Sequence, residues 1–453
     1  MERFFFKKIE LWFVLLLLLL AAIGAILFGA AVRNETLGHS RFGAFGTFAY
    51  KLAAAPADLQ DALSAKDDNW MSVRDPHRFP GLSGWNFDQS TPEERPDGFI
   101  LLSRYDRAVE RHVVELVDLK SGATEHRLVT RPEEFFAGWT PEIENDIATA
   151  HIPKRFRAIH PYLLENGDLL IKDHHSPLVR LTPCGDLVWR SKRGYYHHAL
   201  ERGPDGHFWL PDKLPLEADY TVNDNFGNVA IAQISEDGEV LYSRSIGDVL
   251  IEHGYEYLVF NSSEYNNNPM HLNDVQPVFE DGPYWKRGDV FLSFRDSSMV
   301  LQFRPETDEI IWMRRGPWRA QHDVDIVDDH TIAIFNNDVI NTSGRAYVRD
   351  ANKISYYDFQ TDSVSGPQDD ALAELEVKAL FGGLFERLPG GFVMVEETSQ
   401  GRLVILDSEG QAVVEYVNRA EDGLVYFLGW TRYMSRADGA RAVEAIKAAN
   451  CES

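Results

Sequence analysis

The sequence predicts an all-β protein: a six-bladed β-propeller with an N-terminal transmembrane helix and short flanking helices. Three observations predict it, namely a strand-and-turn unit that recurs along the chain, a high content of aromatic residues, and one long apolar run near the N-terminus. The 453 residues include 27 Phe, 17 Tyr and 10 Trp. Aromatic side chains suit pleated, half-buried strands, and the length suits one large domain or two to three smaller ones.

The recurring unit is clearest between Ala158 and Arg190, which read AIHPYLLENGDLLIKDHHSPLVRLTPCGDLVWR. It contains a histidine, an Asn-Gly turn, an apolar strand, a polar break, an alternating strand, a Gly-Asp turn and a final Trp. Asn-Gly and Gly-Asp between apolar runs are hairpin signals. Related units begin at His197, Met270 and Gln321, and each has a histidine near its start, a turn and an apolar strand.

Two further segments, 99–128 and 384–417, fit the same scheme without the histidine, which gives six units. The six units average about 55 residues each, and a period of about 40–50 residues with about four strands per unit is typical of a propeller. The insertions between units, such as 131–156 and 246–268, would then be loops on one face. A β-sandwich would also explain the alternating strands, but it does not explain a histidine at the start of successive repeats.

The N-terminus carries the targeting signal. Leu11 to Val32 form an uncharged run of 22 residues, and a membrane-spanning helix needs about 20. The run is longer than the core of a cleavable signal peptide, and it lacks a good cleavage site. Arg3, Lys7 and Lys8 precede it, and basic residues stay on the cytoplasmic side. We therefore expect an uncleaved, single-pass anchor in the inner (cell) membrane, with the C-terminal domain in the periplasm or the extracellular space.

These patterns divide the chain into four regions. Residues 1–32 are the expected anchor, and residues 33–95 are a connector that is partly helical. Residues 96–435 form the expected propeller, and residues 436–453 a C-terminal helix.

Composition argues against several classes of function. The net charge is −25, which repels polyanions, so we expect no nucleic-acid partner. The sequence has no CxxC pair and no GxxxxGK[ST] motif, and we expect neither a metal nor a cofactor. Cys184 and Cys451 lie far apart in the sequence, which favours two separate thiols over one disulfide.

The repeat register brings candidate catalytic residues together. In a propeller, equivalent positions of all blades lie at the same height around the central axis. His198, His271 and His322 would open equivalent inner strands, so their side chains are expected to converge near the mouth of the channel. His271 and Asn273 alternate along one strand and would point to the same side. Arg295 ends the next strand, where a guanidinium offers a fork of donors suited to a tetrahedral oxyanion.

This set of residues resembles the bacterial PAPS-independent arylsulfotransferase (aryl-sulfate sulfotransferase) family. The matching pieces are His271-Leu272-Asn273, the LSFRDSS segment with Arg295, Gln321-His322 followed by an apolar strand and FNND, and HHA at His197–Ala199. The resemblance implies an exported six-bladed propeller that moves a sulfuryl group from a phenolic sulfate ester to another hydroxyl compound through a sulfohistidine. The implied partners are a small-molecule sulfate ester donor and a hydroxyl acceptor.

The resemblance also implies a role for each matching residue. His322 matches the histidine that becomes sulfurylated, and a neutral imidazole is a good nucleophile near pH 7. His271, Asn273 and Arg295 match the residues that hold the sulfuryl oxygens. His198 matches the remaining active-site histidine. The candidates for substrate binding are His197, which is also the alternative to His198, and Asn336.

Structural roles remain open for several of these residues. His322 could bond to a neighbouring blade, Arg295 could pair with Asp296, and His160 could line the channel or serve the fold alone. The pair His174-His175 lies in the polar break of its unit, so we expect a solvated loop rather than a metal site.

Two other functions remain open for the whole molecule. A non-catalytic, membrane-tethered propeller could bind a ligand or support assembly. A sulfate-ester hydrolase would use water in place of the acceptor.

Overall fold

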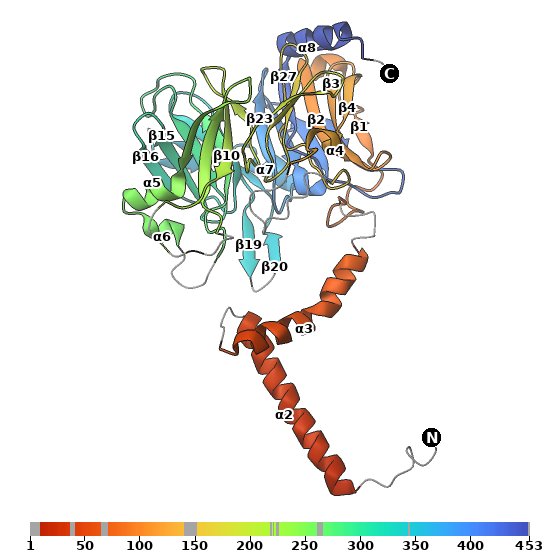
Figure 1. Cartoon of the computed structure of the whole chain (residues 1–453). Coiled ribbons are helices and arrows are strands. Elements are labelled where there is room, and N and C mark those ends of the chain that lie inside the picture. Colours follow the sequence, from red (N-terminus) through yellow and green to blue (C-terminus); the bar gives the residue numbers. More distant parts are fainter. Residues whose placement is uncertain are drawn as a thin grey trace. The chain divides into compact units, whose positions relative to one another are not determined.

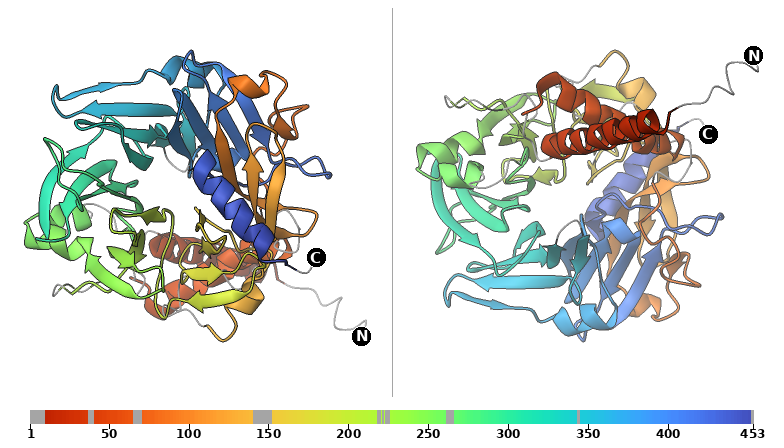
Figure 2. Two further views of the ribbon diagram at one scale, coloured as in Figure 1. Left: turned by 90° about the horizontal axis from the view of Figure 1, so that it is seen from above. Right: turned by 90° about the horizontal axis from the view of Figure 1, so that it is seen from below.

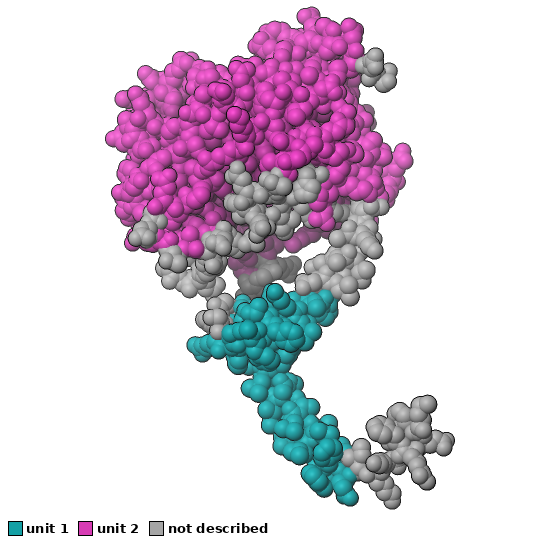
Figure 3. Space-filling view, in the orientation of Figure 1, with its two compact units in different colours: residues 1–70 teal, residues 71–453 magenta. Residues whose placement is uncertain are grey.

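The computed structural model describes residues 10–36, 41–64, 71–139, 152–217, 220, 222, 226–260, 266–342 and 345–451. The chain divides into two compact units, residues 1–70 and residues 71–453 (Figure 3). The basic residues Arg3, Lys7 and Lys8, on which the expected membrane orientation rests, lie outside the described residues.

The first unit consists of two helices. Helix α2 (Leu11–Thr36) contains the whole apolar run and is long and apolar enough to cross a membrane. Helix α3 (Gly43–Ser64) contains Pro56 and belongs to the region expected as a partly helical connector. The two helices pack against each other.

The second unit is a six-bladed β-propeller, which confirms the predicted fold. Six antiparallel sheets follow one another around a ring (Figures 1 and 2). Blade 1 consists of β27 (Arg432–Ser435), β2 (Gly98–Asp106), β3 (Arg111–Asp118) and β4 (Thr124–Val129). Blade 2 consists of β5 (Tyr162–Leu163), β6 (Leu169–Ile171), β7 (Val179–Leu181) and β8 (Leu187–Arg190). Blade 3 consists of β9 (Glu201–Arg202), β10 (Phe208–Lys213), β11 (Val229–Ile234) and β12 (Val240–Ser245).

The remaining three blades carry additions. Blade 4 consists of β13 (Leu272–Pro277), β14 (Val290–Phe294), β15 (Met299–Arg304) and β16 (Glu309–Arg315). Blade 5 consists of β17 (His322–Ile326), β18 (Thr331–Asn336), β21 (Lys353–Asp358) and β22 (Ser363–Ser365), with an inserted hairpin of β19 (Val339–Thr342) and β20 (Arg345–Val348). Blade 6 consists of β23 (Leu384–Leu388), β24 (Phe392–Glu397), β25 (Arg402–Leu406) and β26 (Ala412–Val417), and β1 (Gly84–Asn86) adds a fifth strand to it.

The direction of the strands determines on which of the two faces of the ring each connection lies. The first strand of each blade begins, and the second strand ends, at the same face of the ring. The connections between blades and those between second and third strands therefore share this face, which we call the site face. It carries α5 (Ile246–Glu252), α6 (Glu256–Val259), α7 (Asp369–Glu374), η2 (Thr398–Gln400) and the β19–β20 hairpin. The connection from blade 1 to blade 2, on the same face, carries α4 (Pro132–Phe135). Two more helices, η1 (Pro92–Glu94) and α8 (Arg436–Ala448), flank β2 and β27 at the opposite face.

Two buried carboxylates and one half-buried carboxylate join neighbouring blades near their inner strands. Asp274 of blade 4 accepts a hydrogen bond from the Val324 N–H of blade 5 at 2.8 Å. Asp323 of blade 5 accepts from Phe385 of blade 6 at 2.8 Å, and Glu386 of blade 6 accepts from Tyr433 of blade 1 at 2.9 Å. These bonds repeat one contact around half of the ring, and we call the three side chains the inter-blade carboxylates.

The two cysteines form a disulfide, so the expectation of two separate thiols is wrong. Cys184 lies in the turn between β7 and β8 of blade 2, and Cys451 follows α8. Helix α8 buries Ala442 and Ile446 against blades 1 and 2 in one hydrophobic cluster, and this packing brings the C-terminus to blade 2. The expectation failed because it used the separation of the cysteines in the sequence, which contains no information about long-range packing.

Candidate active site

Each inner strand is entered through a residue with positive φ. A non-glycine residue in this conformation is uncommon, and such residues cluster at functional sites. The six residues, in chain order, are His160, His198, His271, Ala320, Gly382 and Trp430. His198 and His271 therefore hold equivalent positions, as expected, whereas His322 lies two residues beyond its equivalent, Ala320.

The imidazole of His322 is held on both sides. The side chain is 1% exposed. Its Nδ1 lies 2.8 Å from Oδ1 of Asn337, and the Gly382 N–H points at its Nε2 with an N···N distance of 3.2 Å. Asp323, with φ 43°, follows it and shifts the register of β17 against β18. This bulge re-aims the side chain, which is a common use of β-bulges near functional sites.

The surroundings of Asn337 determine the tautomer of His322. The Asn337 amide nitrogen donates to the carbonyls of Ala379 at 3.1 Å and Gly382 at 2.8 Å. Its Oδ1 therefore faces the imidazole as an acceptor, and His322 Nδ1 must carry the proton. The lone pair consequently lies on Nε2.

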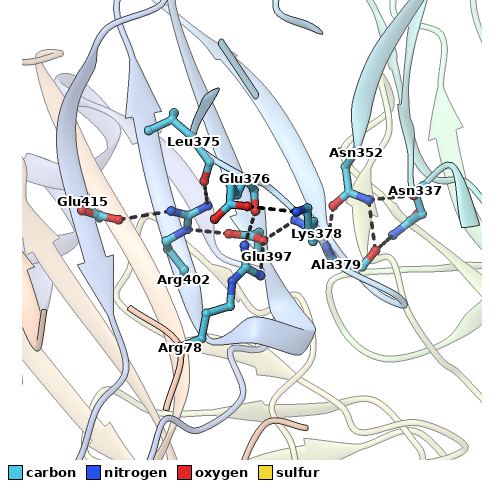
Figure 4. A network of polar contacts seen from close by, with 10 residues as sticks. All are labelled: Arg78, Asn337, Asn352, Leu375, Glu376, Lys378, Ala379, Glu397, Arg402 and Glu415. Carbon is cyan, nitrogen blue, oxygen red and sulfur yellow. Dashed lines mark hydrogen bonds and ion pairs between the residues drawn. The ribbon is translucent and has the colours of Figure 1, made fainter. Parts of the chain in front are cut away.

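A polar network fixes the loop that carries Gly382 (Figure 4). Asn352 accepts from the Ala379 N–H at 2.5 Å and donates to the Asn337 carbonyl at 2.7 Å. Glu397 accepts from the Lys378 N–H at 2.5 Å and from Arg402 Nε at 2.5 Å. These bonds fix the loop between blades 5 and 6, and thereby the backbone that contacts His322.

His198 is the centre of a histidine cluster. Its ring centroid lies 5.2 Å from that of His271 and 6.1 Å from that of His322. His197 Nδ1 lies 2.9 Å from His198 Nδ1, so one of the two rings donates to the other. The three histidines expected to converge do lie together.

The cluster also includes the pair His174-His175, which was expected to be solvated. Both residues lie in a turn and are half-buried, so they keep partial contact with solvent, but their rings join the cluster: the His174 ring lies 4.4 Å from His198, and the His175 ring lies 5.5 Å from His197. The pair belongs to the connection between β6 and β7, which lies on the site face. Position in the blade, rather than loop character, decides the environment of these two residues.

Trp430 closes the cluster from blade 1. Its ring lies 5.9 Å from His198, 6.1 Å from His322 and 5.5 Å from His160. Trp430 is 2% exposed and lies at the equivalent position to His198 and His271. The repeat register could have identified it, because it is the corresponding residue of a unit that lacks the histidine. His160 itself is buried and accepts from the Leu200 N–H at 3.3 Å, so it supports the fold of the adjacent blade.

Arg295 directly follows β14 and lies beside the cluster. Its backbone N–H donates to the His271 carbonyl at 3.0 Å, and its guanidinium donates to Asp296 at 2.8 Å. The Nε atom is buried and has no hydrogen-bond partner among the described residues. Arg295 therefore makes the ion pair considered from the sequence and still has a donor to offer.

Asn273 and Asn336 do not contact the imidazole of His322 by hydrogen bonds. Asn273 is fully buried and donates to the Gln321 carbonyl at 2.8 Å. A register shift between Leu272 and Asp274 breaks the alternation that placed Asn273 on the same side as His271. Asn336 accepts from the Arg319 N–H at 2.9 Å and supports the loop before His322, while its neighbour Asn337 contacts the ring.

Burial and positive charge keep the histidines neutral. Burial, and then the charge of Arg295, lower the pKa of His322 to about 3. Burial also lowers the pKa values of His198 and His271 well below their usual range. Lys172 donates to the His198 carbonyl, and burial lowers the pKa of this lysine to about 7. All three imidazoles are therefore unprotonated at neutral pH, the state required of a nucleophile or base.

The potential metal ligands lie elsewhere. Within the part of the chain that the structure describes, Asp328, Asp329 and His330 place three ligating atoms within 4.8 Å of one another. They occupy the exposed turn between β17 and β18, on the face opposite the site face. Exposed acidic turns commonly lack an ion, so this group indicates no functional site.

The family model for arylsulfotransferase (ASST) matches residues 160–419, more than half of the chain. The chain belongs to this arylsulfotransferase family. The matched range begins at His160 and includes every histidine of the cluster. No curated protein sequence matches the chain.

Solved structures with similar folds are distant in sequence. A protein of unknown function from Bacteroides caccae has 11% identity and a TM-score of 0.45, covering 74% of this chain and 98% of its own. A streptogramin B lyase has 11% identity and a TM-score of 0.38, covering 78% and 98%. A virginiamycin B lyase from Staphylococcus aureus has 10% identity and a TM-score of 0.38, covering 75% and 91%.

Proposed function

We propose that this member of the arylsulfotransferase family transfers a sulfuryl group between phenolic or other hydroxyl compounds through a sulfohistidine at His322. One observation carries the proposal: His322 is held neutral, with its lone pair on Nε2, beside His198, His271 and Arg295. A nucleophile with a fixed tautomer and a neighbouring set of donors is the arrangement that covalent group transfer requires.

In the first half-reaction, Nε2 of His322 attacks the sulfur of the donor ester. The N–S bond forms, the bond between sulfur and the ester oxygen breaks, and the aryloxide leaves and takes a proton from solvent. The Asn337 oxygen, 2.8 Å from Nδ1, stabilises the positive charge that the imidazole acquires. The free Nε donor of Arg295 and the imidazole of His271 would bind the peripheral sulfuryl oxygens, where negative charge collects in a loose transition state.

The Gly382 N–H must leave Nε2 before attack, because it occupies the lone pair at 3.2 Å. In the proposal the sulfur takes its place, and the released N–H becomes a donor for a sulfuryl oxygen. The network around Asn352 and Glu397 keeps this N–H close to the reacting atoms.

In the second half-reaction, the acceptor hydroxyl attacks the sulfur and the N–S bond breaks. The hydroxyl proton passes to a neutral imidazole, for which His198 is the nearest candidate to His322. A positioned base of this kind contributes about 10²–10⁴-fold to the rate. His197, with its Nδ1 contact to His198, would take part in binding or in proton transfer.

The proposed location is the outer side of a cell membrane. Helix α2 would serve as a single-pass anchor, and the propeller would lie in the periplasm or the extracellular space. The Cys184–Cys451 disulfide supports an oxidising compartment, because disulfides persist there and are rare in the cytosol.

A second candidate, a non-catalytic propeller, has one observation in its favour. His322 is 1% exposed and has a hydrogen-bond contact at both ring nitrogens, as a purely structural histidine would. This reading predicts that no covalent intermediate forms. A sulfate-ester hydrolase, the third candidate, predicts the intermediate but releases free sulfate when no acceptor is present.

Intact-mass measurement distinguishes the candidates. The full-length protein, His322→Ala and His330→Ala are each incubated briefly with an aryl sulfate. His330 is a suitable control because it belongs to the same blade but lies in the exposed turn on the opposite face. The proposal predicts a gain of about 80 Da, one SO₃ group, on the parent and on His330→Ala but not on His322→Ala.

The other outcomes contradict the proposal in different ways. A gain on all three proteins would move the nucleophile to another histidine. No gain on the parent with several aryl sulfates would favour the non-catalytic propeller. A transient gain that decays to free sulfate without an acceptor would indicate the hydrolase.

A further inference from the structure

Helix α3 carries an exposed apolar stripe outside the propeller. Phe45, Phe48 and Leu52 are 51%, 61% and 54% exposed. Their spacing of three and four residues places them on one face of the helix. Large apolar side chains this exposed, grouped on one face, indicate a surface that contacts something else.

The beginning of α3 is attached to the end of α2. The Thr47 hydroxyl donates to Glu35 Oε1 at 2.8 Å, and the Arg41 N–H donates to Asn34 Oδ1 at 3.1 Å. Gly46 is buried, and a Cβ added there would lie 2.8 Å from Glu35 Oε2. Ala49 is fully buried as well. These contacts hold the first turns of α3 at the level of Asn34 and Glu35.

That level coincides with the end of the apolar run. Val32 is its last residue, and Arg33, Asn34 and Glu35 follow within α2. In a spanning helix the hydrocarbon region ends where such residues begin, and aromatic side chains concentrate at this boundary. Helix α3 does not continue the axis of α2 (Figure 1).

We propose that α3 lies in the membrane interface and inserts Phe45, Phe48 and Leu52 between lipid headgroups on the side where α2 ends. The occupant of the stripe is therefore the lipid surface itself. The proposal rests on α2 serving as a membrane anchor. An interfacial helix presents an apolar face to the bilayer and places basic side chains near the headgroups, and Lys51 lies next to Leu52 at the edge of the stripe.

Depth-dependent quenching tests this placement. Single cysteines are introduced in the full-length protein as Phe48→Cys, Tyr50→Cys and Leu18→Cys, labelled with an environment-sensitive fluorophore, and reconstituted into phosphatidylcholine–phosphatidylglycerol vesicles. The native cysteines are bonded to each other and do not react. Tyr50 is two residues from both Phe48 and Leu52, which at about 100° per residue places it on the far side of the helix. Leu18 lies in the middle of the apolar run and reports on the anchor.

We expect lipids brominated near the glycerol backbone to quench the label at position 48 at least about twofold more than the label at position 50. Lipids brominated deep in the chains should quench the label at position 18. Equal, weak quenching at 48 and 50 together with strong quenching at 18 would overturn the proposal while leaving the anchor intact. Quenching at 48 without quenching at 18 would support an interfacial α3 and refute the spanning α2.

A second copy of the chain is the competing occupant. It would shield position 48 from water in detergent as well as in vesicles, and the shielding would depend on protein concentration. Shielding of this kind, without quenching by brominated lipids, would overturn the lipid interface in favour of a dimer.

Discussion

The chemistry proposed for His322 depends on one neighbouring amide. Asn337 is completely buried, and its three side-chain contacts leave it a single orientation. The same residue therefore fixes the ring, assigns the proton to Nδ1 and supports the loop that carries Gly382. Substitution of a residue that orients a reacting histidine commonly lowers the activity of the enzyme by one or more orders of magnitude.

We predict that Asn337→Ala lowers kcat by about 10²-fold or more, because the His322 tautomer is no longer enforced. The substitution also removes the Asn337 donor from the buried Gly382 carbonyl, which costs about 1–3 kcal/mol, whereas the Ala379 carbonyl keeps the Asn352 amide at 3.1 Å. Steady-state kinetics and a thermal melt measure the two effects separately. Asn336→Ala is the matched control, since Asn336 is also buried and supports the neighbouring loop at Arg319 but does not contact His322. Equal losses of kcat in both variants would contradict the assigned role.

Sequence reasoning located the histidines of the site but not the residues that hold them. His198, His271 and His322 could be predicted because they lie near the starts of repeats. Asn337 and Gly382 could not, because their contacts with His322 span 15 and 60 residues, and the Gly382 contact crosses from blade 6 to blade 5. The expectation that Asn273 points to the same side as His271 depended on strand alternation, and alternation fails at a bulge such as the one between Leu272 and Asp274.

At the level of elements, turn chemistry predicted the blades well. The Asn-Gly and Gly-Asp pairs of the first unit lie in the β5–β6 and β7–β8 turns, as expected for hairpins. Within the region 436–453, where a C-terminal helix is expected, α8 runs from Arg436 to Ala448. The expected connector over 33–95 contains both α3 and the strand β1, and β1 pairs with β26 through Gly84 and Val417. A three-residue strand added to a distant sheet has no signal in the local sequence.

The disulfide attaches one element to the ring. It joins α8 to blade 2, while the strand before α8, β27, pairs with β2 of blade 1. We predict that Cys451→Ser lowers the free energy of unfolding by up to about 5 kcal/mol, the chain-entropy estimate for closing a long loop. Denaturant unfolding under non-reducing conditions measures the loss.

The kinetics of the proposed reaction should change little in Cys451→Ser, because α8 follows the far end of β27 and not the site face. Cys184→Ser is the matched variant and should give the same loss of stability. Different stabilities for the two variants would show that one thiol has a role of its own. A large loss of kcat in both would show that α8 also supports the site.

At the scale of the whole molecule, the inter-blade carboxylates stabilise the ring but limit its pH range. Burial raises the pKa values of Asp274, Asp323 and Glu386, because a charge in the interior lacks the solvation of water. For Glu386 the folded pKa rises to about 7. A group with a raised folded pKa contributes stability that is fully present below its unfolded pKa and is lost as the pH rises through the folded value.

Replacing Glu386 with glutamine keeps the acceptor for the Tyr433 N–H and removes the titration. The stability that depends on protonated Glu386 is lost between pH 4.5, the ordinary pKa of a glutamate, and about 7, its pKa in the folded protein. We predict that the free energy of unfolding of Glu386→Gln rises relative to that of the parent as the pH increases across this window. The relative gain reaches at most about 3 kcal/mol at pH values above the window. The lowered pKa values of the buried histidines act in the opposite direction, but they cancel in this difference because both proteins contain them.

Denaturant unfolding at pH 4.5, 6 and 8 measures the trend. A difference that does not change with pH would show that Glu386 has the same pKa in the folded and the unfolded protein, and that burial does not raise it.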